Sequence, residues 1–102
     1  MRIIAEATVR EWARQHAAAG PALEHWLALT RQARWGGWTD LCRTFARAVA
    51  VLAASGKPVV VFNIAGNRYR LIAAVHYNRQ TVNTLRFLTH VQYDQQQTKD
   101  QL

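Results

Sequence analysis

The pattern of hydrophobic residues changes near residue 55, and this change is the strongest constraint on how the chain can fold. Up to about Ala54 the chain is rich in Ala, Leu, Trp and Arg at helical spacing. From Pro58 to His90 it is rich in Val, Ile, Tyr, Phe and Thr, with short turn sequences between the runs. Helices followed by strands predict an α+β fold, in which the helices cover one face of an antiparallel sheet.

The first half contains three helical patterns separated by breaks. Apolar residues share one helix face at Val9, Trp12, Ala13 and His16, and another at Leu23, Trp26, Leu27 and Thr30. Gly20-Pro21 separates these two helices, because proline suits the first helical position. After Gly36-Gly37, Thr39 is expected to cap a helix over residues 40 to about 53. We expect the four tryptophans, Trp12, Trp26, Trp35 and Trp38, to pack in the core and between elements, not to serve as base-stacking platforms.

The second half predicts three strands over residues 59–64, 68–77 and 81 to 89 or 90. Ala65-Gly66-Asn67 and Asn78-Arg79-Gln80 are the turns between them, and loops this short join antiparallel neighbours. Residues 1–4 form a further short strand in this interpretation. The expected architecture is therefore a set of N-terminal helices on one face of a three- to four-stranded antiparallel sheet.

Length and charge limit the function classes. A chain of 102 residues fits one domain over residues 1–102, with a polar, flexible tail over residues 95–102. Thirteen basic residues face six acidic ones, and all but two of the thirteen are arginine. This charge predicts a polyanionic partner, either nucleic acid or an acidic protein, although a solvated basic surface is the simpler alternative.

The sequence also predicts a cytoplasmic location. The first twelve residues carry four charges, which is unlike a secretion signal, and no apolar run is long enough to span a membrane. The single cysteine, Cys42, cannot form an internal disulfide, so a reducing compartment is expected. We interpret Cys42 as a buried or bystander thiol.

Side-chain alternation sorts the charged residues of the predicted strands by face. Arg68 and Arg70 share one face of the second strand. On the third strand, Leu85 and Phe87 are expected on the helix-covered face, with Arg86 and His90 on the opposite face. The four charged residues would then form one phosphate-binding cluster on an open sheet face. The alternative is an ordinary exposed face whose arginines point to water.

Three segments of the second half resemble the HigB toxin family, which belongs to the RelE-like toxin–antitoxin ribonucleases. They are residues 61–72 (Val-Phe-Asn-Ile-Ala-Gly-Asn-Arg-Tyr-Arg-Leu-Ile), Arg86-Phe87, and residues 89–94 (Thr-His-Val-Gln-Tyr-Asp). The similarity extends more loosely over nearly the whole chain. It departs from the family pattern in the Ala- and Val-rich residues 46–55 and at Leu85.

The resemblance implies a RelE-like fold and a toxin of a type II toxin–antitoxin system. Such a toxin cleaves mRNA on the ribosome as a metal-independent endoribonuclease, and a HigA-like helix-turn-helix antitoxin neutralises it. No cofactor, metal or membrane partner is expected. The four histidines, His16, His25, His76 and His90, show no paired ligand spacing.

The chemistry of such a site suggests a role for each candidate residue. His90 is the expected general acid or base, with Tyr93 as an alternate acid or a stacking residue. Arg70 and Arg86 would hold the scissile phosphate. Asp94 would orient His90 or Tyr93. The expected contacts to flanking phosphates or ribosomal RNA come from Lys57, Arg68 and Asn67.

Each role has a structural alternative. Asn67 would be a turn residue that tolerates positive φ, and Asp94 would cap a C-terminal helix. Thr89-His90 would be a turn in which the histidine only satisfies backbone groups, and Tyr93 would pack at the sheet edge. For the whole protein, the alternatives are a non-catalytic basic RNA-binding module and a docking surface for an acidic protein.

Overall fold

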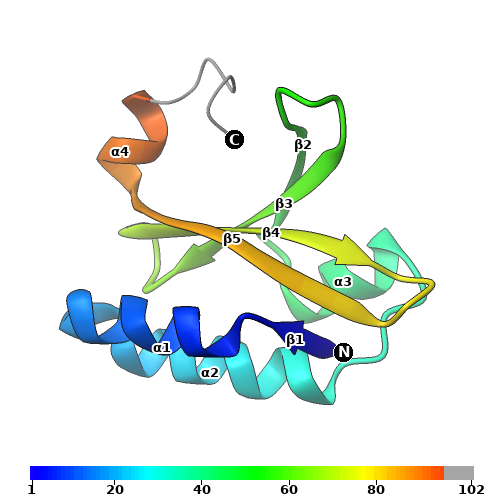
Figure 1. The fold of residues 1–102 in the computed structure, drawn as a ribbon, viewed down its shortest axis with the longest axis horizontal. Coiled ribbons are helices and arrows are strands. Elements are labelled where there is room, and N and C mark those ends of the chain that lie inside the picture. The colour runs from blue at the N-terminus through cyan, green and yellow to red at the C-terminus, as the bar shows by residue number, and fades with distance from the viewer. Residues whose placement is uncertain (96–102) are drawn as a thin grey trace.

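A computed structural model describes residues 1–95 as a curved sheet with two long helices on one face (Figure 1). The strands are β1 (Arg2–Ile4), β2 (Val49–Leu52), β3 (Pro58–Ile64), β4 (Tyr69–His76) and β5 (Thr81–Thr89). The helices are α1 (Glu6–Gln15), α2 (Gly20–Gln32), α3 (Trp38–Thr44) and α4 (His90–Gln95), with a 3₁₀ turn at Ala17–Ala19. The α+β class is confirmed. The expected flexible tail falls outside the described residues, except that Gln95 ends α4.

The sheet has the strand order β1-β5-β4-β3-β2. The three expected strands are confirmed as the antiparallel neighbours β3, β4 and β5. The residue 1–4 segment is also a strand, but β1 runs parallel to β5, with Ile3 opposite Val82. The sheet is therefore mixed and five-stranded, rather than antiparallel with three or four strands. β1 supplies hydrogen-bond partners for the outer edge of β5, which would otherwise be exposed.

The expected helix over residues 40 to about 53 is wrong in both boundaries. Gly37 occupies the N-cap position, so Thr39 lies in the first turn of α3, and the helix ends at Thr44. The Ala- and Val-rich residues that follow form β2, which pairs with β3. β-branched residues suit a pleated edge strand, and the pairing satisfies the free backbone edge of β3. Tertiary pairing here overrides the helical propensity of alanine.

The main core lies between the sheet and helices α1 and α2. Trp26 on α2 is almost fully buried and meets the Phe62 ring edge-on at 5.4 Å between centroids. Trp12 on α1 stacks on Phe87 at 5.7 Å. Trp35 is also buried, whereas Trp38 at the start of α3 is 38 % exposed and lies outside the core.

A β-bulge in β5 overturns the expected pairing of Leu85 with Phe87 on one face. Ile72 lies opposite Arg86 and Ala73 lies opposite Thr84, so Leu85 is an extra residue without a partner on β4. Thr84 and Phe87 consequently both point into the core, and Leu85 is 41 % exposed. An inserted residue of this kind shifts the alternation of side chains by one position.

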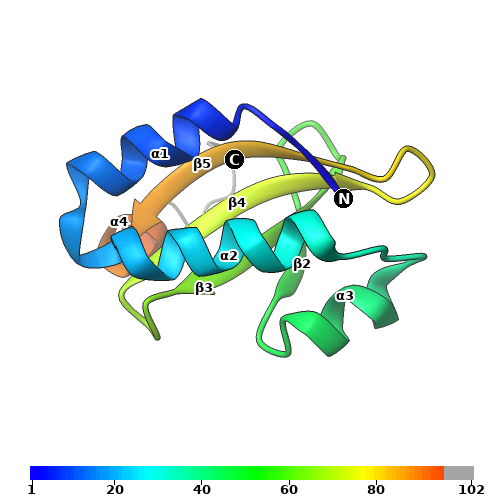
Figure 2. The ribbon, with the colours of Figure 1, turned by 90° about the horizontal axis from the view of Figure 1, so that it is seen from below.

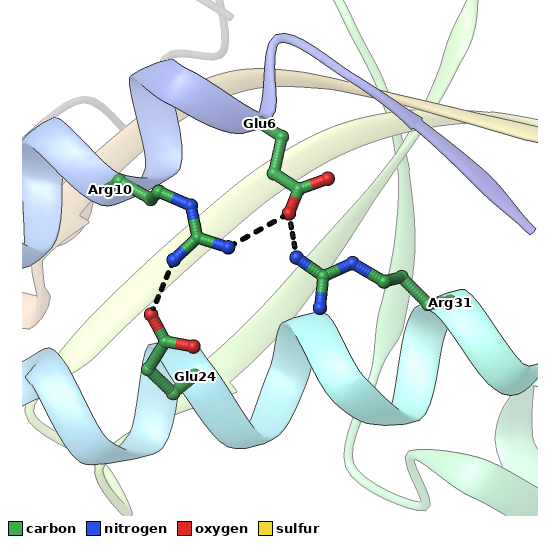
Figure 3. Close-up of polar contacts among 4 residues, drawn as sticks. All are labelled: Glu6, Arg10, Glu24 and Arg31. Atoms are coloured by element: carbon green, nitrogen blue, oxygen red, sulfur yellow. Dashed lines mark hydrogen bonds and ion pairs between the residues drawn. The ribbon is translucent and has the colours of Figure 1, made fainter.

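An ion-pair network links α1 to α2 on the outer surface of the helical layer (Figure 3). Arg10 donates to Glu6 at 3.1 Å and to Glu24 at 2.9 Å, and Arg31 forms a further ion pair with Glu6. These side chains are 32 % to 57 % exposed, so each pair stabilises the fold only weakly. The network uses two of the six acidic residues to neutralise part of the arginine charge.

The bulge predicts very different losses of stability for two apolar substitutions that are two residues apart. Phe87→Ala should lower the free energy of unfolding by about 3 kcal/mol, because it removes a ring stacked between Trp12 and Tyr69. Leu85→Ala should cost less than about 0.5 kcal/mol. Urea denaturation followed by tryptophan fluorescence measures both values. Equal losses would mean that the two side chains share the core face and that the bulge is absent.

Candidate functional site

The candidate site lies on the sheet face opposite α1 and α2, at the end where the β3–β4 turn and α4 meet (Figure 1). Residues that pair across antiparallel strands point to the same face. Arg70 lies opposite Leu88, and Arg86 lies opposite Ile72. The two arginines are therefore diagonal neighbours on one face, and such neighbours are about 7–8 Å apart. The expected convergence of Arg70 and Arg86 is confirmed by this register.

The Arg70 guanidinium is fixed by the turn that precedes its own strand. Its Nη1 donates to the carbonyl oxygens of Asn67 at 3.0 Å and Tyr69 at 3.1 Å. Its Nη2 donates to the side-chain oxygen of Asn67 at 3.2 Å. Among residues 1–95 no carboxylate pairs with Arg70. The group is thus held in position while its charge stays available to an anion.

Helix α4 brings the remaining candidates over this face. The Thr89 hydroxyl accepts the Gln92 N–H at 3.1 Å, and the Gln92 side chain accepts the Thr89 N–H at 2.9 Å. This reciprocal capping box defines the start of the helix. The His90 N–H donates to the Arg68 carbonyl at 2.8 Å, which ties α4 to the β3–β4 turn. The backbone of His90 is thereby anchored, and its side chain is exposed.

Tyr93 on α4 lies close to Arg70 on β4 and so connects the helix to the arginine side of the site. The Arg70 guanidinium carbon lies 6.0 Å from the centre of the Tyr93 ring, at the outer limit of a cation–π contact. The ring also packs on a small second apolar cluster formed by Val59, Val61 and Ile72. The sheet face predicted to be open is therefore partly covered.

The other candidate residues are placed less centrally. Arg68 is exposed in the β3–β4 turn and lies outside the strand expected to carry it. Lys57 is exposed in the β2–β3 hairpin, at the opposite end of β3 from Asn67. Asp94 is exposed and makes no hydrogen bond or ion pair with another described residue. The structure thus places Arg70, Arg86 and Tyr93 on one sheet face, and it joins the backbone of His90 to that of Arg68.

Two asparagines, Asn67 and Asn63, are neighbours of Arg70. The left-handed residues of the β3–β4 turn are Ala65 and Gly66, so the expectation that Asn67 has positive φ is wrong. Its side chain instead accepts a hydrogen bond from Arg70. Asn63 was missed at the sequence level: it lies directly opposite Arg70 on β3 and is half-buried. A lone asparagine in a run of Val, Phe and Ile was the available signal.

Residues 1–95 contain no group of three or more His, Cys, Asp or Glu side chains placed to hold a metal ion. No helix in the same range is long and apolar enough to cross a bilayer. Cys42 on α3 is half-buried and forms no disulfide. The burial of the Tyr77 hydroxyl raises the pKa of Tyr77, and the nearby Cys42 thiol raises it further.

Comparison with known families identifies the chain. Residues 19–96 match the family model HigB_toxin, described as the RelE-like toxic component of a toxin–antitoxin system. No curated protein sequence matches the chain. The matched region includes β3, β4, β5 and α4, and so all the elements that form the site. The chain therefore belongs to the HigB toxin family, whose members are RelE-like toxins that pair with an antitoxin.

Proposed function

We propose that this toxin is an endoribonuclease that cleaves mRNA on the ribosome and acts in the cytoplasm. The proposal is supported by Arg70 and Arg86 on one sheet face and by the Tyr93 ring, whose centre lies 6.0 Å from the Arg70 guanidinium carbon. His90 begins α4, and its backbone is hydrogen-bonded to the β3–β4 turn. Arg70 is fixed by Asn67 without a carboxylate partner among the described residues. Side chains of this type can bind a phosphodiester and move protons near it.

The proposed reaction is an attack within the RNA chain. The ribose 2′-oxygen attacks the adjacent phosphorus, the bond to the 5′-oxygen breaks, and a 2′,3′-cyclic phosphate and a 5′-hydroxyl result. One group accepts the 2′-hydroxyl proton and another donates a proton to the 5′-oxygen. His90 is our preferred acid or base, with Tyr93 as its alternate. Arg70 and Arg86 stabilise the charge that develops on the phosphate.

The surroundings support secondary roles. Asn67 and Tyr69 hold the Arg70 guanidinium, so Asn67 acts as a positioning residue as well as a candidate RNA contact. Arg68 and Lys57 are exposed cations available to flanking phosphates. Asp94, one residue from Tyr93 on α4, is the weakest member of the proposed site. No metal or cofactor takes part in the proposed reaction.

Ribosome dependence and the antitoxin type are part of the same proposal. His90 and Arg86 are exposed, so in this proposal the site binds a phosphate but does not enclose the RNA strand. In-line attack requires the 2′-oxygen, phosphorus and 5′-oxygen to be aligned, and the ribosome would supply that alignment. We propose a HigA-like helix-turn-helix protein as the antitoxin, on the resemblance of residues 61–72 and 89–94 to HigB toxins.

Substitutions in the proposed site should separate cleavage from folding. His90→Ala should lower the rate of mRNA cleavage by about 10²–10⁴-fold, because it removes a proton-transfer group. Arg70→Gln and Arg86→Gln should lower it by about 10²–10³-fold. The measurement is the mapping of new RNA 5′ ends with translating ribosomes, together with growth on induction.

Arg14→Gln is the matched control, since Arg14 is exposed on α1 with its side chain 74 % accessible. It should retain wild-type cleavage and toxicity. If wild-type protein leaves the RNA intact while still binding it, the non-catalytic RNA-binding alternative replaces the proposal. If the His90 and arginine variants cleave at the wild-type rate, the assigned site is wrong.

The capping box offers a test of positioning. Thr89→Ala removes the side-chain acceptor for Gln92 and should destabilise α4 by about 1 kcal/mol. The rate of cleavage should fall, and Thr89→Ser, which keeps the hydroxyl, should restore it. Hydrogen exchange should accelerate in residues 90–94 and stay unchanged in β4. If the Thr89→Ala protein shows faster exchange in α4 but cleaves RNA at the wild-type rate, then the position of α4 does not contribute to cleavage.

A further inference from the structure

A second concentration of positive charge lies at the end of the molecule opposite α4. The start of β1, the end of α2 with the loop that follows, and the β4–β5 turn lie together at this end (Figures 1 and 2). Their side chains line a hollow of about 500 Å³. Four of its seven lining residues are the arginines Arg2, Arg31, Arg34 and Arg79, and none is Asp or Glu. Residues that are far apart in sequence thus form one basic surface, which we call the arginine hollow.

The charge of the arginine hollow is largely uncompensated. Arg31 is paired with Glu6 in the network between α1 and α2 (Figure 3). Within residues 1–95, Arg2, Arg34 and Arg79 form no ion pair, and all three are exposed. Burial, followed by the positive charge of Arg34, lowers the pKa of the Met1 ammonium group. Repulsion among like charges costs stability unless an anion occupies the surface.

The backbone that carries these arginines is cross-linked by hydrogen bonds. The Gln80 side chain donates to the carbonyl oxygen of Trp35 at 2.7 Å and to that of Tyr77 at 2.8 Å. The Arg2 N–H donates to the Gln80 carbonyl at 2.7 Å. The β4–β5 turn is therefore joined both to β1 and to the loop after α2. The arrangement is organised before any ligand binds, which reduces the entropy lost on binding.

We propose that the arginine hollow is a second RNA-binding site, which takes the phosphodiester backbone and is separate from the cleavage site. Guanidinium groups bind phosphate through paired hydrogen bonds. A protein partner would need exposed aromatic or aliphatic anchors, and no large apolar side chain is exposed among the lining residues. Arg79 follows β4, about 20 Å along the strand direction from Arg70. One phosphate cannot reach both sites.

The test compares two double variants with the same change in net charge. Arg34→Gln/Arg79→Gln removes two hollow arginines that lie in loops, outside the regular elements. Arg14→Gln/Arg43→Gln removes two exposed arginines from α1 and α3. The probes are a labelled 2′-O-methyl RNA strand, which lacks the attacking hydroxyl, purified small ribosomal subunits, and polyglutamate as an acidic polypeptide. Affinity is measured over a range of salt concentrations.

The hollow variant should bind at least one probe on the order of tenfold more weakly near 0.1 M salt, and its salt slope should fall by about one for each arginine. The control should change less than about threefold. A loss confined to the single strand would identify messenger RNA as the ligand, and one confined to the subunit would identify ribosomal RNA. Equal losses in both variants, no loss in either, or a loss only toward polyglutamate would overturn the proposal.

These binding measurements do not require cleavage. If the wild-type protein fails to cut any RNA and the hollow variant still binds more weakly than the control, the proposed nuclease function fails alone. If cleavage requires His90 and the two double variants bind alike, the arginine hollow fails alone. The two proposals therefore have distinguishable outcomes.

Discussion

The pairing of β4 with β5 is the interaction on which both faces of this toxin depend. On one face it aligns Phe87 and Tyr69, whose rings stack at 5.1 Å beneath α1. On the other face the same ladder places Arg70 and Arg86 as diagonal neighbours. The bulge at Leu85 makes both arrangements compatible, because it lets Thr84 and Phe87 enter the core while Arg86 faces outward. A continuous register would send one of these groups to the wrong face.

The arginines of this protein have two kinds of surroundings, which differ in whether their charge is neutralised. Between α1 and α2, acidic residues neutralise arginines in an exposed network. At one end of β4, Arg70 is held by hydrogen bonds to neutral groups. At the other end, Arg2, Arg34 and Arg79 form no ion pair with another residue of the range 1–95. Asn67 illustrates the second kind, since it orients Arg70 without reducing its charge. A neutral partner fixes geometry and leaves the electrostatic attraction for an anionic ligand intact.

The two ends of the sheet suit different tasks in the proposals made above. The end near α4 combines cations with groups able to transfer protons, His90 and Tyr93. The residues that line the arginine hollow near β1 include four arginines and no His, Tyr, Asp or Glu, which suits the proposed role in binding. An RNA-directed toxin with an exposed site gains from a separate binding surface, because binding energy from remote parts of a substrate can position the reacting part.

The sequence by itself determined the α+β class, the three central strands and the resemblance to HigB toxins, because period-two alternation and the spacing of the motifs are local properties. Only the tertiary structure decided the parallel pairing of β1, the strand at residues 49–52 and the bulge, because each depends on an edge or a core contact with a distant segment. Asn67 shows the same limit within the site: its turn was predictable, but its hydrogen bond to Arg70 required the folded hairpin. The arginine hollow assembles residues 2, 31, 34 and 79, and such an assembly is visible only once the chain has folded.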